Sequence, residues 1–555
     1  MMMLTESPTV GFHVEEFSEA ERSVLSRYFT NLDGPVFALT NLPEVVKGAL
    51  FARYSRSPKS VRRLFLDEFV EDAGSGMAAI AESLGDDTSA ARRRAEDLYA
   101  RVFNDYGDDS VAQLGGVHLA CEQASNVLTK VLERGRLAAY LEQSTRYIFY
   151  DQLLGDRFRY MVPPEVAASP HAGRYAATMD WLFGTYADLV GRLVPYYETL
   201  YPRAEEDSAF VWRSTIRAKA CDDLRGLLPA ATTSNVGIFA TGQAYESMLL
   251  AMRIHPLAEA RHYADLMLTE LRKVIPAFMR RVDVPERGGR WSAYLRETAA
   301  AMEEWAARIP GRPEARPEVT LVEWDPDAEL KVAAAALYPH TDLPDGQLAG
   351  AVAALDEASR AELIAAYAGD RTNRRHKPGR GMERTAYRFD ILCDYGIFRD
   401  LQRHRMLTID WQRLGPLHGY VTPESVADIA ATDVWDEAMA RTADLHRYVA
   451  ADLGPDVAQY VVPFAYKIRF YLHLDAREAF HMLELRSAAG GHPDYRRIAQ
   501  QMHTLIDEQA GHHSIAKAMS FVDHNEYELA RLDGERRAAA RRAAAGLPDP
   551  DSPSL

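Results

Sequence analysis

The sequence has few cysteines and no long hydrophobic run. Its 555 residues include three cysteines, which stand alone without a CxxC pair or the spacing of a zinc site. Isolated, reduced thiols are typical of cytoplasmic proteins. No apolar stretch is long enough to span a bilayer, and the first residues lack the basic and apolar regions of a secretory signal. We therefore expect a cytoplasmic protein that binds no membrane.

An excess of positive charge is also missing. The chain carries 80 acidic and 64 basic residues, a formal net charge of −16, which argues against a general nucleic-acid-binding surface. Local arginine clusters in such an acidic chain are better suited to small anions. The sequence has no GxGxxG or P-loop fingerprint, no HExxH motif and no nucleophile elbow. We therefore expect no metal site, and a dinucleotide would have to be held by side chains.

The length of the chain predicts more than one domain, because single hydrophobic cores rarely grow beyond roughly 250–300 residues. The helical pattern is interrupted at Ile309–Asp327, which contains four prolines and a glycine. Paired segments such as Leu228-Pro229 and Val462-Pro463 occur in the same order on either side of this break. We expect one repeat over residues 1–312, a second over 313–534 and a flexible tail over 535–555.

One short motif occurs twice, and each copy keeps a different part of it. Leu132–Ile148 (LERGRLAAYLEQSTRYI) keeps Glu142, Ser144 and Arg146, but has Gly135 between its first two arginines. The segment after Tyr140 is polar and follows an apolar run. If it is extended, the three polar side chains point to one face, where they suit a phosphorylated nucleoside. If it is helical, Glu142 and Arg146 form a surface ion pair.

The second copy, Leu401–Tyr420 (LQRHRMLTIDWQRLGPLHGY), has an intact Arg-His-Arg at Arg403, His404 and Arg405. Trp411 and Arg413 stand where Glu and Ser of the first copy would align. Three donor-rich side chains in a row can hold a pyrophosphate or stabilise charge on a reduced flavin. The alternative is a solvated basic turn. Since each copy lacks what the other keeps, we expect one composite site.

Further candidates lie near the end of the second repeat. Asp475, Arg477 and His481 fall on one helical stripe, with Arg486 about half a turn round from Arg477. Arg469 would begin the strand that leads into this helix. These side chains can bind a ligand, or they can form a polar helix surface whose terminal arginine complements the helix dipole.

Periodicity predicts an α+β fold, in which a helix-rich unit around a small mixed β-sheet is built twice. The expected helices are Gly116–Tyr140, Leu257–Met279 and Asp475–Ser487, and the expected strands are Val319–Trp324, Arg384–Leu392 and Arg469–Leu474.

In combination, these motifs resemble the flavin-dependent thymidylate synthase family. Its signature is Arg-His-Arg, seven residues and then Ser. The first repeat supplies Arg136, seven residues and Ser144, and the second supplies Arg403–Arg405, with an upstream Met382-Glu383-Arg384 that is similar to the family's Phe-Glu-His. The resemblance covers most of both repeats and lies in the order of the motifs.

The resemblance implies active sites where subunits meet, here in a homodimer of tandem chains. It implies FAD as cofactor, NADPH and methylenetetrahydrofolate as co-substrates, and conversion of dUMP to dTMP without a protein nucleophile. By position, dUMP would contact Glu142, Ser144, Arg146, Arg469 and Arg486. The flavin would contact Arg403, His404, Arg405, Arg477 and His481.

The chain departs from the family pattern at several of these positions. Asp475 and His481 stand where the family has asparagines, and Asp400 stands where it has a glutamine. These departures leave two alternatives open. The protein can be a flavin enzyme that modifies another pyrimidine nucleotide, or a non-catalytic paralogue that binds nucleotide.

Overall fold

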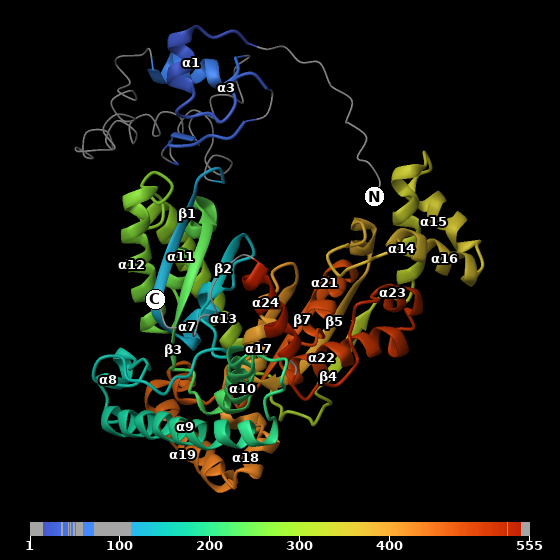
Figure 1. Ribbon diagram of the computed structural model, residues 1–555. Helices are drawn as coiled ribbons and strands as arrows, with labels where there is room; N and C mark the ends of the chain where they lie inside the picture. The colour runs from blue at the N-terminus through green and yellow to red at the C-terminus, as the bar shows by residue number, and fades with distance from the viewer. Residues whose placement is uncertain are drawn as a thin grey trace.

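Two small β-sheets, each covered by helices, form the body of the protein (Figure 1). The computed structural model describes residues 15–34, 37–42, 44, 46, 47, 50, 59–70, 113–529 and 531–544. The first sheet has the strand order β1-β3-β2 and the second the order β4-β5-β7-β6. Their strands are β1 (Gly116–Ser125), β2 (Ala138–Glu142), β3 (Thr233–Thr241), β4 (Val319–Trp324), β5 (Ala386–Asp394), β6 (Thr408–Trp411) and β7 (Lys467–Asp475).

The α+β class and the tandem form are confirmed. The expectation of mixed sheets needs a correction, because every strand pair of these two sheets is antiparallel. The inner strands, β3 of the first sheet and β5 and β7 of the second, each run against both of their neighbours.

The helices follow the strands in the same order in both repeats. In chain order they are α1 (Glu19–Leu25), α3 (Val61–Leu64), α7 (Asn126–Leu132), α8 (Pro164–Ala167), α9 (Ala172–Leu200), α10 (Ala209–Leu224), α11 (Gly242–Arg253), α12 (Ala258–Val274), α13 (Arg290–Ala307), α14 (Ala328–Leu337), α15 (Asp345–Ala353), α16 (Glu357–Ala368), α17 (Tyr395–Leu401), α18 (Glu424–Asp428), α19 (Thr432–Leu453), α20 (Pro455–Ala458), α21 (Ala476–Arg486), α22 (Pro493–Thr504), α23 (His513–Ala518) and α24 (Leu532–Ala544). Short 3-10 segments are η2 (Arg225–Leu227), η4 (Tyr338–His340), η5 (Arg380–Arg384), η6 (Pro416–His418) and η7 (Gln459–Val461), and π-helical segments are η1 (Phe65–Val70), η3 (Pro285–Gly289) and η8 (Leu505–Gln509). None of the helices in the part of the chain that is described is long and apolar enough to cross a membrane.

Each repeat turns from a strand directly into a helix at two places, and a polar side chain caps the helix at all four. The N-cap side chain accepts a hydrogen bond from a backbone N–H three residues later, which satisfies a donor at the helix start. The N-caps are Ser125 before α7, Thr241 before α11, Asp394 before α17 and Asp475 before α21. Asp475 is therefore a capping residue, and the helix predicted over Asp475–Ser487 is confirmed as α21 with its two caps.

The segment Gly116–Tyr140, predicted as one helix, is wrong in its first part. Residues 116–125 form β1, which pairs with β3 more than a hundred residues later. Non-local pairing of this kind overrides local helical propensity. A β-bulge between Cys121 and Ala124 places one extra residue in β1, and Gln123 there has a φ of 56°. This bulge explains why β1 is one residue longer than β5.

The two repeats join where the paired apolar-proline segments meet. Pro229 and Pro463 form an antiparallel bridge. The N–H of Ala230 donates to the carbonyl of Val462 at 2.8 Å, and the N–H of Phe464 donates to that of Leu228 at 2.9 Å. Helices α9 and α19 lie close together below this junction (Figure 1). One hydrophobic core runs through both repeats, while residues 17–66 contribute a separate cluster.

The expected tail begins with a helix. Residues 532–544 form α24, and Arg536 Nε donates to Asp207 Oδ1 at 2.6 Å. The rest of the tail, residues 545–555, lies outside the described residues.

Gly226 lies at the junction, where a Cβ would come within 2.9 Å of Trp435 Cη2 and 3.2 Å of Ala465 Cβ. Since Trp435 is fully buried, we expect Gly226→Ala to lower the stability by about 1–3 kcal/mol. Gly184→Ala is the matched control, because open space surrounds Gly184 within α9 and alanine favours a helix. Thermal unfolding of both variants checks this, and equal melting temperatures would contradict the close packing at the junction.

Candidate functional site

A buried network of charged side chains lies between the two repeats. Glu142 ends β2 of the first repeat, and its side chain is completely buried. Arg399 Nη2 donates to its Oε1 at 2.7 Å, and Arg403 Nη2 donates to its Oε2 at 2.5 Å. Lys130 Nζ reaches the same Oε2 at 3.3 Å. Burial alone would raise the pKa of Glu142, but Arg399, Lys130 and Arg403 hold it well below its usual range.

Arg146 lies in the turn that follows β2 and is also buried. Its Nε and Nη2 donate to the two carboxylate oxygens of Asp222 at 2.7 and 2.8 Å, and its Nη1 donates to the Tyr495 hydroxyl of the second repeat at 2.8 Å. The Ser144 hydroxyl accepts from the Arg146 N–H at 3.1 Å. The alternative of a helical surface pair between Glu142 and Arg146 is therefore wrong, because the segment is a strand end and a turn.

Asp400, in α17, is the carboxylate on which arginines of both repeats converge. Arg225 Nη1 donates to it at 3.1 Å. Against the effect of burial, Arg225, Arg146, Arg403 and Arg486 together hold the pKa of Asp400 well below its usual range. The Arg146 and Arg486 guanidinium groups also lie over the same ring, that of Tyr495, at 5.2 and 5.3 Å. The structure thus brings Arg146 of the first repeat next to Arg486 of the second.

Arg225 is a candidate that the sequence analysis missed. It is buried in the short 3-10 segment η2. The signal is its position three residues before Leu228-Pro229, where the second repeat has Gln459 three residues before Val462-Pro463.

Arg469 lies elsewhere. Alternate residues of β7 are buried, and Arg469 belongs to the other set, which points to the open face of the second sheet. Its Nη1 donates to Asp390 Oδ2 on β5 at 2.8 Å. The expected grouping of Arg469 with Arg146 and Arg486 therefore needs a correction, and Arg225 takes its place in the cluster.

His404 is held by two side chains of α21 in its own repeat. Arg486 Nε donates to its Nε2 at 3.0 Å, and its Nδ1 faces Glu478 Oε1 at 3.0 Å. Burial, with the help of Arg486, lowers the pKa of His404 to about 4. The ring is therefore neutral, with its proton on Nδ1. His404, Glu478 and His481 are close enough to hold a metal ion, but both nitrogens of His404 already have partners.

The remaining flavin candidates are closer to solvent. Arg405 is exposed and donates to the backbone carbonyl of Ala138 in the first repeat. Arg477 donates to the Pro378 carbonyl at 3.1 Å and to Glu383 Oε1 at 3.3 Å. Arg403 Nε is buried and lacks a hydrogen-bond partner among the described residues. A cavity of about 230 Å³ lies beside Arg403 and Arg405. Glu133 and Glu142 also line this cavity, which is smaller than the roughly 300–1,000 Å³ of small-molecule sites, so Arg403 and Arg405 fit one anionic group of a flavin nucleotide at this edge.

The network carries more positive than negative charge. Its cations are Lys130, Arg146, Arg225, Arg399, Arg403, Arg486 and Arg531, and its carboxylates are Glu133, Glu142, Asp222, Asp400 and, through His404, Glu478. Burial raises the pKa of neighbouring Asp394 to about 7, so that group is only partly charged near neutral pH. Seven cations against five carboxylates and part of a sixth leave between one and two positive charges. A phosphate monoester carries about that much negative charge near pH 7.

The chain is similar to known proteins along most of its length. The family profile described as thymidylate synthase complementing protein matches residues 63–277 and 320–510. A UPF0159 protein of Chlamydia muridarum is 38% identical over 532 residues, which cover 95% of this chain and 99% of that protein. A UPF0159 protein of Thermoplasma acidophilum is 29% identical over 88% of this chain and 98% of its own length.

Two further matches cover less of the chain. A flavin-dependent thymidylate synthase of Clostridium tetani is 27% identical over 181 residues, 32% of this chain and 67% of that protein. The crystal structure of the UMP/dUMP methylase PolB from Streptomyces cacaoi, bound with 5-Br dUMP, covers 38% of this chain and 97% of its own, with 19% identity and a TM-score of 0.29.

Removing the Glu142 charge should destabilise the protein strongly. Glu142→Gln leaves Arg399 and Lys130, which are almost completely buried, beside a neutral amide, and loss of one partner from a buried ion pair costs about 3–5 kcal/mol. Glu437→Gln is the control, since Glu437 pairs with Arg441 on the exposed surface of α19 and such pairs contribute roughly 0–1 kcal/mol. Chemical denaturation measures both. A Glu142→Gln variant as stable as the control would contradict the network's structural role.

Proposed function

Because the chain belongs to the thymidylate synthase complementing protein family, we propose that it methylates dUMP to dTMP. The protein is an enzyme of the thymidylate synthase-like methyltransferase type, and the family implies a flavin cofactor. We propose FAD as this flavin, with NADPH and methylenetetrahydrofolate as co-substrates. The observation that carries the proposal is that Arg146 of one repeat and Arg486 of the other lie over the same Tyr495 ring, at 5.2 and 5.3 Å, while Arg225 bonds Asp400 across the repeats at 3.1 Å.

The nucleotide phosphate is proposed to bind where these arginines meet. Their guanidinium groups supply the charge-assisted donors that phosphate oxygens accept. Ser144, whose oxygen already accepts from the Arg146 N–H, can donate its hydroxyl proton to the same phosphate, and we propose that it forms no covalent intermediate. Glu142 is saturated by three cations, so it acts as a positioning residue for Arg399 and Arg403.

The flavin is proposed to lie along the edge formed by Arg403, Arg405, Arg477 and His481. When bound, it supplies the hydride that completes the methyl group. The unpartnered Nε of Arg403 and the exposed guanidinium of Arg405 are available to an anionic part of the cofactor. Neutral His404 accepts from Arg486 and therefore orients that guanidinium towards the nucleotide.

Asp400 supports a second candidate, a different pyrimidine nucleotide as substrate. This carboxylate sits inside the arginine cluster, at the position where the resembled family has glutamine. A carboxylate accepts hydrogen bonds but donates none when ionised. It can therefore select a substrate that presents a donor, such as an additional hydroxyl group.

The direct test is product formation by the purified full-length protein loaded with FAD. Reactions contain NADPH, methylenetetrahydrofolate and either dUMP or UMP, and products are separated by chromatography. We expect dTMP from dUMP. Methylation of UMP alone would favour the second candidate. Tight nucleotide binding without product from either substrate would instead indicate a non-catalytic paralogue.

Flavin binding is tested at matched positions of the two repeats. Arg405 donates to Ala138 in the first repeat, and its counterpart Arg136 donates to Thr408 in the second. Arg405→Ala should lose a charge-assisted contact of about 1.5–3 kcal/mol and bind FAD roughly ten- to hundredfold more weakly. Arg136→Ala should keep the flavin content of the wild type. Flavin absorbance after gel filtration measures both, and equal retention in the two variants would reject the assignment.

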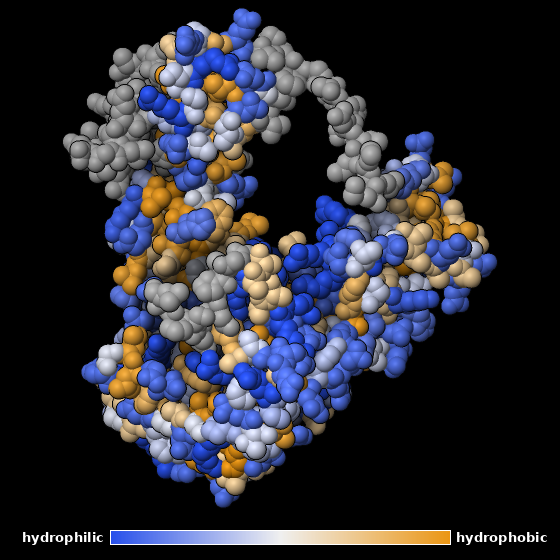
Figure 2. All heavy atoms as spheres, in the orientation of Figure 1, coloured by the Kyte–Doolittle hydropathy of each residue, from blue (hydrophilic) through white to orange (hydrophobic). Residues whose placement is uncertain are grey.

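We propose that the protein works as a homodimer through the open face of the first sheet. Leu137 and Leu141 are 73% and 81% exposed, and Phe239 is 43% exposed next to them on β3. Figure 2 shows apolar residues gathered over this part of the molecule. Exposed apolar patches of this kind are typical of interaction surfaces, and this one adjoins Arg405.

Leu141→Asp should convert the dimer to a monomer, because a buried carboxylate at the interface would be unpaired. Leu417→Asp is the control, since Leu417 is equally exposed but belongs to η6 of the second repeat. Light scattering after gel filtration gives both masses. A monomeric wild type, or a dimeric Leu141→Asp variant, would exclude this interface.

Cysteine chemistry supports a cytoplasmic location, which we also propose. All three cysteines are free and buried. Burial raises the pKa of Cys121 to about 11 and that of Cys221 to about 12. Such thiols stay protonated and unreactive, as suits a reducing compartment.

A further inference from the structure

The tandem fold produces a second location equivalent to the composite site. The register of β2 on β3 matches that of β6 on β7, since Ala139 pairs with Phe239 and Thr408 pairs with His473. At this second location the end of β6 lines one cavity with α7 and α11, and in the composite site the end of β2 contacts α17 through Glu142 and Arg399. We propose that it is a separate binding site for a flat aromatic molecule that carries an anionic group.

The equivalent side chains have changed from charged to small or apolar. Gly135 stands in the place of His404, and Ala244 stands in the place of Glu478. Met252 corresponds to Arg486, because each is eleven residues beyond its N-cap, and Trp411 corresponds to Glu142. In the composite site the charged side chains fill the space with ion pairs. Here the smaller residues leave a cavity of about 680 Å³, within the range of roughly 300–1,000 Å³ that suits small-molecule ligands.

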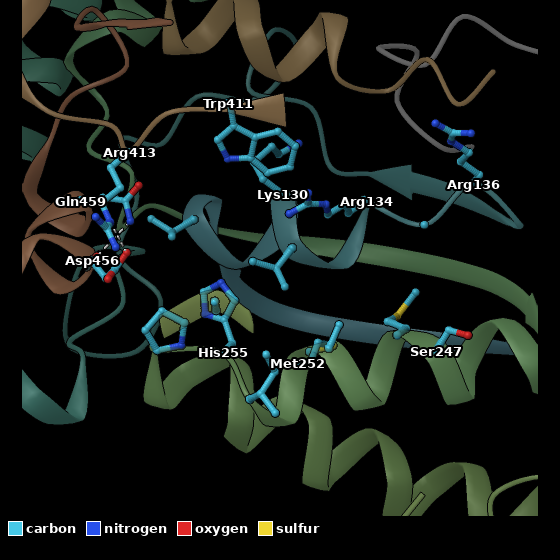
Figure 3. Close-up of a pocket in the computed structure, with 18 of the residues that line it drawn as sticks. Lys130, Arg134, Arg136, Ser247, Met252, His255, Trp411, Arg413, Asp456 and Gln459 are labelled. Carbon is cyan, nitrogen blue, oxygen red and sulfur yellow. Dashed lines mark hydrogen bonds and ion pairs between the residues drawn. The ribbon is translucent and has the colours of Figure 1, made fainter. Parts of the chain in front are cut away.

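Figure 3 shows how the cavity is enclosed. Helix α11 forms one wall with Met252 and Ser247, and His255 follows it. The opposite wall consists of α7 and the end of β6, which carries Trp411. Burial lowers the pKa of His255 to about 4, so its ring is neutral and adds no charge to the lining.

The Trp411 ring gives the cavity its aromatic component. The Arg134 guanidinium lies 5.1 Å from the ring centroid, and Phe398 holds the ring from another side at 5.3 Å. Arg134 corresponds to Arg403, so a buried ion pair with Glu142 in one site is replaced by a cation–π contact with Trp411 in the other. Trp side chains favour flat ring systems as neighbours, in stacked or edge-to-face arrangements.

The rim of the cavity is basic. Arg134, Arg136, Arg296 and Arg413 line it together with one carboxylate, that of Asp456. Arg413 is bonded to Asp456 at 2.8 Å and to Glu303 at 2.6 Å, so Arg136 and Arg296 supply the excess of positive charge. Arg134 is 60% exposed and forms an ion pair with Asp410, whereas Arg136 donates to the neutral Thr408 hydroxyl at 2.9 Å, so the entrance keeps positive charge. An apolar interior with a basic rim fits a ligand whose rings enter the cavity while its anionic group remains at the mouth.

Two fluorescent probes test the proposal. The first is 8-anilinonaphthalene-1-sulfonate, a flat aromatic anion that fluoresces in apolar surroundings. The second is its uncharged relative N-phenyl-1-naphthylamine. Full-length protein should bind both. Ala244→Phe fills the cavity, and overpacking should weaken both by at least about tenfold. The double variant Arg134→Ala/Arg136→Ala should weaken the sulfonate probe and leave the uncharged one unchanged. Trp305→Ala, on the exposed face of α13, controls for binding of dye to that surface and should change neither affinity.

Two results would overturn the proposal. Unchanged binding of both probes by Ala244→Phe would mean that the dyes bind elsewhere. Equal loss of both probes in the rim variant would remove the preference for an anion. Two measurements distinguish this site from the composite site. Ala244→Phe should retain FAD, and Arg405→Ala should retain binding of the probes. Loss of FAD from a folded Ala244→Phe variant would make this cavity the flavin site and contradict a separate ligand.

Discussion

Glu142 is the last residue of β2, and its buried carboxylate is bound by Arg399 and Arg403 of the second repeat. The arrangement of the site depends on this interaction. An ionised carboxylate without water is strongly unfavourable unless cations and donors surround it. Arg399, Arg403 and Lys130 meet that requirement. They in turn have limited freedom, because each is bound to a fixed carboxylate. The two repeats therefore share one electrostatic unit, which adds directional contacts to the hydrophobic core that runs through both.

The two repeats share the same arrangement of strands and helices, but the side chains that lie between them differ. All four strand–helix junctions keep a polar N-cap, because each must satisfy the same N–H groups at the start of a helix. The residues that point between the repeats are under no such constraint. On one side they form a charged network around Asp400 and Glu142, and on the other they line a cavity with a basic rim. A single fold thereby presents two chemically different sites at equivalent places.

The sequence predicted the parts of this structure that depend on local pattern. Alternation located β5 and helical spacing located α21, although Asp475, expected on a stripe of ligand candidates, caps the helix instead. Residues 116–125 were assigned wrongly because their strand forms only by pairing with β3, far along the chain. Among the site residues, complementary motif copies correctly indicated that Arg146 and Arg486 lie together. Arg469 was misplaced because its strand alternation points it to the open face, and Arg225 was missed because it lies in an irregular segment without a motif of its own.

The central claim is that one nucleotide site is built from both repeats, and a double-mutant cycle tests it most directly. Arg146→Lys in the first repeat and Arg486→Lys in the second each lose a guanidinium that lies over Tyr495. The dissociation constant for dUMP is measured by calorimetry for wild type, both single variants and the double variant. Residues that share a ligand couple by about 0.5–3 kcal/mol, whereas independent sites add within about 0.3–0.5 kcal/mol. A composite site predicts coupling of at least about 1 kcal/mol, and additive effects would contradict it.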